Sequence, residues 1–214
     1  MTDKIDICRE KTQKVLLVEG KTDCHVVMSL CKAFNVTEGL FGIYQCGSDD
    51  GVLKRLDALI ALYGDPKVIG VMLDNDKPGR WQSIENIVKK YSYQFPKKPD
   101  VNGTCIQGID DEPKLGFWLM PNNQDSGMLE DFCVELAEPE SLTFARECVE
   151  QAQQKKLTTF KQVHQSKAIV HTYLAWQDEP GYPLGKAITS QALLSNRSIA
   201  TSFTDWLIRL FTSV

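Results

Sequence analysis

The sequence lacks any uninterrupted apolar run that is long enough to cross a bilayer as a helix. Its opening residues, MTDKIDICREK, alternate charged residues with isolated apolar ones, and they do not form the apolar core of a signal peptide. We therefore expect a cytoplasmic protein that has no membrane partner.

Paired cysteine motifs are also missing. The seven cysteines are scattered, their number is odd, and no two of them form a CxxC pair. This distribution predicts reduced thiols that are largely buried. The three histidines, His25, His164 and His171, likewise show no clustering typical of metal ligands.

Positive charge is not in excess. The 24 Lys and Arg residues are outnumbered by 28 Asp and Glu residues, which gives a net charge of −4. A nucleic-acid partner would therefore have to be met by a local basic surface or through bridging metal ions. With 214 residues, 43% of them hydrophobic, and no internal repeat, the chain can bury the core of a soluble globular protein.

Short apolar runs rich in β-branched residues alternate with segments of helical periodicity in the first part of the chain. The pattern predicts strands at 14–18, 41–46 and 68–73, and helices at 22–35, 51–63 and 81–91. Thr22 is the expected N-terminal cap of the first helix. Successive strand–helix units imply a parallel sheet with right-handed crossovers.

The pattern changes after residue 100. Residues 104–109 and 115–120 are typical of two strands joined as a hairpin at a sheet edge. Later periodicity predicts helices at 128–136, 142–154, 160–176, 183–194 and 203–211. The expected fold class is α/β, with a mostly parallel, Rossmann-type sheet domain at 1–137 and a helical C-terminal extension at 138–214 packed on it.

Acidic residues follow two of the expected strands. Glu19 comes directly after the first strand, and Asp74 and Asp76 come after the third. Parallel sheets place their sites along the carboxyl ends of the strands, so these side chains should converge if the two strands are neighbours. Asp23 lies one helical turn beyond Glu19 and can point back to the same edge.

Like charges gathered in this way repel one another unless a cation compensates, and oxygen ligands suit Mg²⁺ or Mn²⁺. Such ions support phosphodiester chemistry, in which a carboxylate such as Glu19 can relay a proton. The alternative is that Glu19 and Asp74 only cap the helices that follow them. That alternative explains poorly the third acid, Asp76, two residues after Asp74.

The segment Val18-Glu19-Gly20-Lys21-Thr22-Asp23, followed later by Leu73-Asp74-Asn75-Asp76, resembles the glutamate and DxD motifs of Toprim domains. The resemblance covers roughly residues 14–135. It implies a Toprim-like sheet in which the glutamate serves acid/base catalysis or metal binding and the two aspartates bind magnesium. The implied partner is nucleic acid.

The spacing of Glu19 and Asp23, together with Gly127-Met128-Leu129-Glu130-Asp131, is closest to OLD-type nucleases and small stand-alone Toprim-related proteins. This resemblance implies that Glu130 and Asp131 add metal ligands and that Lys167 is a candidate catalytic lysine. The simpler interpretations are that the two acids favour a helix dipole and that Lys167 is an ordinary surface lysine.

These observations favour a small metal-dependent nuclease or nucleotidyl-transfer enzyme. One alternative is a non-catalytic Toprim-scaffold module whose C-terminal helices bind a protein partner or a second copy of the chain. Another is a haloacid-dehalogenase-type phosphatase, which also has an Asp-x-Asp after an apolar strand. The Lys77-Pro78-Gly79 that follows here does not fit that family.

Overall fold

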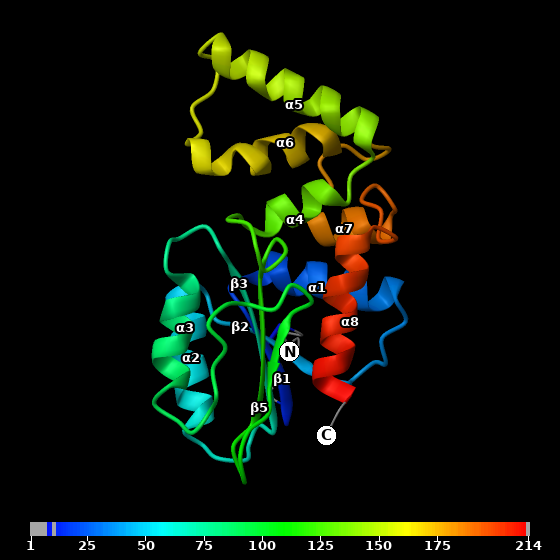
Figure 1. The fold of residues 1–214 in the computed structure, drawn as a ribbon. Coiled ribbons are helices and arrows are strands. Elements are labelled where there is room, and N and C mark those ends of the chain that lie inside the picture. The colour runs from blue at the N-terminus through cyan, green and yellow to red at the C-terminus, as the bar shows by residue number, and fades with distance from the viewer. Residues whose placement is uncertain (1–7, 10–11, 213–214) are drawn as a thin grey trace, which may run out of the picture.

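The sheet is the centre of the fold. A computed structural model describes residues 8–9 and 12–212, and its five strands are arranged in the order β2-β1-β3-β5-β4 (Figure 1). All neighbouring strands are parallel except β4 and β5, which are antiparallel. This arrangement confirms the mostly parallel sheet with an edge hairpin. The strand bounds are Lys14–Val18 (β1), Gly42–Gln45 (β2), Val68–Asp74 (β3), Thr104–Ile106 (β4) and Lys114–Met120 (β5).

Helices follow the first three strands and fill the chain after β5. Their bounds are Lys21–Ala33 (α1), Asp49–Ile60 (α2), Arg80–Val88 (α3), Leu129–Glu135 (α4), Pro139–Gln154 (α5), Gln165–Leu174 (α6), Leu184–Thr189 (α7) and Ser198–Thr212 (α8), with a 3₁₀ turn at Gln162–His164. Some predicted details were wrong. Gly20, not Thr22, is the N-terminal cap of α1, and α6 begins only at Gln165, because the residues before it form the 3₁₀ turn. The helix predicted at 183–194 ends at Thr189, and the helix predicted at 203–211 begins at Ser198.

Alternate residues of the strands face two separate cores. Leu16 and Val18 of β1 belong to one buried cluster, which includes residues of α1 and α8. Val15 and Leu17 belong to the other, with residues of α2 and α3. Figure 1 shows α2 and α3 on one face of the sheet and α1 and α8 on the other. The strands are therefore buried on both faces, which explains their continuous apolar sequences.

Two glycines allow α8 to lie close against the sheet. Gly70 of β3 and Gly116 of β5 are directly paired in register. A methyl group on Gly116 would lie 2.3 Å from Leu210 Cδ2, and one on Gly70 would lie 2.9 Å from Phe211 Cζ. The paired glycines therefore form a shallow surface that receives the last turns of α8.

We expect Gly116→Ala to reduce the free energy of unfolding by about 1–3 kcal/mol, because the new methyl group overpacks the contact with Leu210. Denaturant unfolding measures the loss. In the double variant with Leu210→Ala, the atoms that the methyl group meets are gone, so the combined cost should be smaller than the sum of the single costs. Strict additivity of the two costs would show that α8 does not pack at this position.

The expectation of reduced cysteines was wrong at one pair. Cys8 and Cys24 form a disulfide, with their Cα atoms 5.9 Å apart. The backbone N–H of Gln45 donates to the Cys8 carbonyl, which holds residue 8 beside β2 and within reach of α1. Sequence spacing could not reveal this pairing because it depends on the tertiary position of Cys8. The other five cysteines are free thiols.

The helices α5 and α6 lie side by side beyond α4, on the side away from the sheet (Figure 1). The longest helix in the described part of the chain, α5, has 16 residues. None of the described helices is long and apolar enough to span a membrane.

Candidate metal site at the carboxyl edge of the sheet

Two strand ends bring Glu19 and Asp74 together. β1 and β3 are parallel neighbours, so the residues that follow or end them meet at one edge of the sheet. The backbone N–H of Asp74 donates to Glu19 Oε1 at 3.1 Å. This bond joins residues 55 positions apart and holds the glutamate across the end of β3. The convergence expected for these two residues is therefore present.

Asp23 lies in the first turn of α1, where its side chain turns back toward the same edge. Its Oδ2 accepts the Gly20 N–H at 3.0 Å, as the reciprocal bond of a capping box does. The start of α1 thus holds the Asp23 carboxylate at the backbone of Gly20, the residue next to Glu19. This capping bond uses only Oδ2, so Oδ1 of Asp23 can still bind another group.

The start of α4 brings in the third chain segment. Asp74 Oδ1 accepts the backbone N–H of Leu129 at 2.9 Å, which places the next residue, Glu130, at the same edge. Glu130 is buried, with 8% of its surface exposed. Its Oε1 lies 3.0 Å from Lys167 Nζ, and the lysine side chain is 55% exposed. Lys167 therefore contacts the edge from α6.

We refer to Glu19, Asp23, Asp74 and Glu130 as the acid cluster, because their charges act on one another. Burial and the charges of Glu19, Asp23 and Glu130 raise the pKa of Asp74 to about 8. Burial, with the charges of Glu19 and Glu130, raises the pKa of Asp23 to about 6. Burial also raises the pKa of Glu19, although the Asp74 N–H opposes the change. The folded chain thus holds carboxylates where their ionisation is unfavourable.

Arg80 was missed by the sequence reasoning, although it lies one turn beyond the DxD motif. It is buried, with 5% of its surface exposed. Its Nε donates to the Asp74 carbonyl at 3.0 Å and its Nη2 to Asp49 Oδ2 at 2.9 Å, and Asp76 lies 3.6 Å away. Arg80 therefore fixes the end of β3 and offsets the charges of Asp49 and Asp76.

Asp49 was also missed as a member of this edge. It lies at the start of α2, after β2, and its Oδ2 accepts from Lys77 Nζ at 2.5 Å as well as from Arg80. These hydrogen bonds hold the pKa of Asp49 well below its usual range. Its charge nevertheless contributes to the raised pKa of Glu19. The sequence signal was its position after a strand, which matches that of Glu19.

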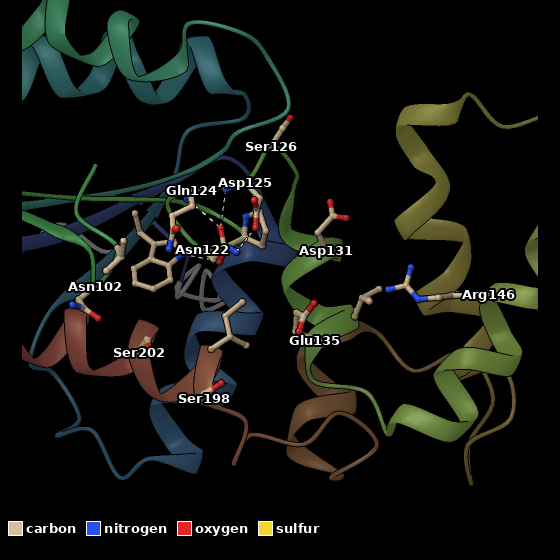
Figure 2. Close-up of a pocket in the computed structure, with 15 residues that line it drawn as sticks. Asn102, Asn122, Gln124, Asp125, Ser126, Asp131, Glu135, Arg146, Ser198 and Ser202 are labelled. Atoms are coloured by element: carbon tan, nitrogen blue, oxygen red, sulfur yellow. Dashed lines mark hydrogen bonds between the residues drawn. The ribbon is translucent and has the colours of Figure 1, made fainter. Parts of the chain in front are cut away.

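The side chain of Asp131 contacts different groups from that of its neighbour Glu130. Its Oδ2 accepts the Met128 N–H at 2.8 Å, and its Oδ1 accepts the Ser166 hydroxyl of α6. It lines a pocket of about 540 Å³ between the β5–α4 loop, α5 and α8 (Figure 2). Both oxygens are engaged, so a role for Asp131 as a metal ligand would require these bonds to break.

The β5–α4 loop connects this pocket to the DxD motif. Asn75 and Gly127 exchange backbone hydrogen bonds of 2.8 and 3.2 Å, and Ser126 donates its hydroxyl to the Asn75 carbonyl at 2.9 Å. The loop therefore lies directly against the residue between Asp74 and Asp76. A ligand in the pocket would be separated from the acid cluster by this loop.

The acids are close without forming a complete ligand set. Within the described residues, no three His, Cys, Asp or Glu side chains are arranged to hold a metal ion as they stand. The chemistry of the donors nevertheless fits a hard divalent cation, because each is a carboxylate. The hydrogen bonds of Glu19, Asp23 and Asp74 each use one oxygen of the pair. The second oxygen of each carboxylate has no hydrogen bond to these backbone N–H groups.

His171 also belongs to this region, although the three histidines show no clustering along the sequence. It lies one turn beyond Lys167 on α6. Burial and the charge of Lys167 lower its pKa, and the charge of Glu130 opposes that change. The pairing of α4 with α6 creates this proximity, and it leaves no pattern in the sequence.

A family model described as a protein of unknown function, DUF3226, matches residues 13–212. The chain belongs to the DUF3226 family. The match runs from β1 to the end of α8, so the sheet, the acid cluster and the helical C-terminal segment all belong to the DUF3226 unit. No curated protein and no solved structure matched this DUF3226 chain.

Proposed function

We propose that this DUF3226 protein carries out metal-dependent phosphodiester chemistry on nucleic acid as a small nuclease with a Toprim-like site. The observation that carries the proposal is the acid cluster. Carboxylates from the residue after β1 and from α1, β3 and α4 lie at one edge of the sheet, although burial and mutual repulsion raise the pKa of Asp74 to about 8. Such repulsion destabilises the folded chain unless a cation offsets it. Binding of a divalent cation is therefore the simplest explanation for the acid cluster.

The residues that would hold Mg²⁺ or Mn²⁺ are Glu19, Asp23, Asp74 and Glu130, with Asp76 at the margin beside Arg80. Asp131 is a weaker candidate ligand, since both of its oxygens are engaged. When bound, the ion supplies charge stabilisation for the phosphodiester oxygens and lowers the pKa of a water molecule.

The chain's own groups have distinct tasks in this proposal. Glu19 Oε1 is occupied by the Asp74 N–H, which leaves Oε2 as the atom that takes a proton from the attacking water. Arg80 fixes the Asp74 backbone through its carbonyl. Lys167, which is largely exposed and pairs with Glu130, would contact an anionic leaving group.

The direct test is cleavage of single- and double-stranded DNA and RNA by the purified protein. We expect turnover with Mg²⁺ or Mn²⁺, none in EDTA, and recovery when Mn²⁺ is restored, because the acid cluster repels a phosphodiester unless a cation compensates. Activity that persists in EDTA would contradict the metal dependence.

A non-catalytic module is the second candidate, and an exposed aromatic pair favours it. Phe144 of α5 and Trp176, just after α6, are 57% and 46% exposed, and their ring centroids lie 5.5 Å apart. Such a pair suits contact with a protein partner or a second copy of the chain. Binding of a partner without turnover on any substrate or metal would support this candidate over the nuclease.

A further inference from the structure

A second pocket, of about 340 Å³, lies at the outer side of β2. Two arginines, Arg9 and Arg55, line it together with Tyr44 and Gln45 of β2, the loop residues Cys46 and Gly47, and Gly51 of α2. Among the described residues that line it, none is acidic. The pocket is thus a local concentration of positive charge in a protein whose net charge is −4.

Arg55 is the central group of this pocket. Its guanidinium carbon lies 4.4 Å from the centre of the Tyr44 ring, which fixes the orientation of the side chain. Its Nε is buried and has no hydrogen-bond partner. None of the ion pairs among the described residues includes Arg55. Arg55 thus lines the pocket as a cation without an ion-pair partner among the described residues, and such a group suits a ligand that supplies an anion.

The larger pocket beside α4 is lined by more acidic than basic residues, unlike the pocket around Arg55. Asp125, Asp131 and Glu135 line that pocket with a single arginine, Arg146. It would therefore repel a phosphate group, whereas the pocket around Arg55 would attract one.

The pocket of Arg55 is also next to the acid cluster. The backbone N–H of Gly47 donates to the Glu19 carbonyl at 2.8 Å, and that of Cys46 donates to the Val18 carbonyl at 2.9 Å. The pocket wall is therefore one strand away from Glu19, and neighbouring strands are about 4.8 Å apart. That separation suits adjacent groups of one extended ligand.

We infer that the pocket around Arg55 binds a phosphate group of the nucleic-acid backbone next to the phosphodiester held at the acid cluster. This inference rests on the proposed function for the identity of the ligand. Arg55 binds the phosphate oxygens through the planar guanidinium, and Arg9 lies in the wall of the same pocket. The two sites together would position a strand along the edge of the sheet, with the acids at the reacting group and the arginines at its neighbour.

Binding in EDTA tests the inference without turnover. The probes are sodium pyrophosphate, measured by calorimetry, and a short labelled single-stranded oligonucleotide, measured by fluorescence anisotropy. Arg55→Gln should weaken both about tenfold to a hundredfold, since a charged hydrogen bond contributes about 1.5–3 kcal/mol. It should also reduce the slope of log affinity against log salt by about 0.7, the value for one contact with a single strand. Arg55→Lys, which keeps the charge, should show a smaller loss.

The matched control is Lys32→Gln, which removes one exposed charge at the end of α1. Its affinities and salt slope should stay near those of the wild type. Equal losses in Lys32→Gln and Arg55→Gln, or an oligonucleotide affinity unchanged in Arg55→Gln, would overturn the inference. Arg55-dependent binding in a protein that cleaves nothing would overturn the nuclease proposal alone, and the two failures are therefore distinguishable.

Discussion

Replacing Glu19 with glutamine is expected to lower the rate of metal-dependent cleavage by about two to three orders of magnitude. Glutamine retains the Oε1 that accepts the Asp74 N–H, so the packing at the end of β1 should survive. It loses the negative charge and the oxygen that would take a proton. Proton transfer and charge stabilisation in a transition state are each worth about a hundredfold or more.

The matched control is Glu38→Gln, which makes the same chemical change at an exposed position. Initial rates at saturating Mg²⁺ should match the wild type in this control. Circular dichroism should show that both variants are folded. If Glu19→Gln cleaved as fast as the wild type, Glu19 would have no part in the reaction, and an acid cluster that served only to cap helices would become the better interpretation.

The local sequence was sufficient to predict most of the fold. Runs such as Val68–Leu73 are buried on both faces, and their β-branched and apolar residues identify them as strands without tertiary information. The antiparallel pairing of β4 and β5 followed from the short connection between them. The close approach of α8 could not be predicted, because Gly70 and Gly116 have meaning only once β3 and β5 are paired in register.

The candidate site was predictable to the extent that strand ends determine it. Glu19 and Asp74 follow or end adjacent parallel strands, so a pattern of strands was enough to bring them together. Arg80, by contrast, matters because its guanidinium reaches Asp49 of another strand–helix unit. Likewise, Cys8 meets Cys24 only because residue 8 lies beside β2. Contacts that depend on side-chain reach across elements leave no signal in a single sequence.

Replacing Asp74 with asparagine should stabilise the metal-free protein while it removes activity. At pH 8 we expect a gain of about 2–4 kcal/mol in the free energy of unfolding, because folding raises the pKa of Asp74 from 3.8 to about 8. For a chain of this length the gain corresponds to an increase of roughly 5–10 °C in melting temperature. Asparagine keeps the oxygen that accepts the Leu129 N–H, so that bond is retained.

The sign of the pH dependence follows from the direction of the shift. An aspartate whose pKa is higher in the folded state stabilises the protein fully below its unfolded pKa of 3.8, and this contribution is lost as pH rises through the folded value. Asp74, and to a smaller extent Asp23, should therefore make metal-free wild-type protein less stable between about pH 4 and pH 8. Asp49 has a lowered pKa, so its contribution is lost only at lower pH.

Thermal unfolding in EDTA from pH 5 to pH 8, followed by addition of Mg²⁺ at pH 8, measures the pH dependence of the wild type and the stability gain of Asp74→Asn. The wild-type melting temperature should fall across this range and recover with Mg²⁺, since a bound dication removes the repulsion and stabilises the folded state by mass action. Asp74→Asn should show a flatter profile and little response to Mg²⁺, whereas Asp205→Asn, at an exposed position of α8, should behave as the wild type does. A wild-type protein that grew more stable toward pH 8 without metal would mean that the acid cluster is not crowded in solution, and the reason for placing an ion there would be lost.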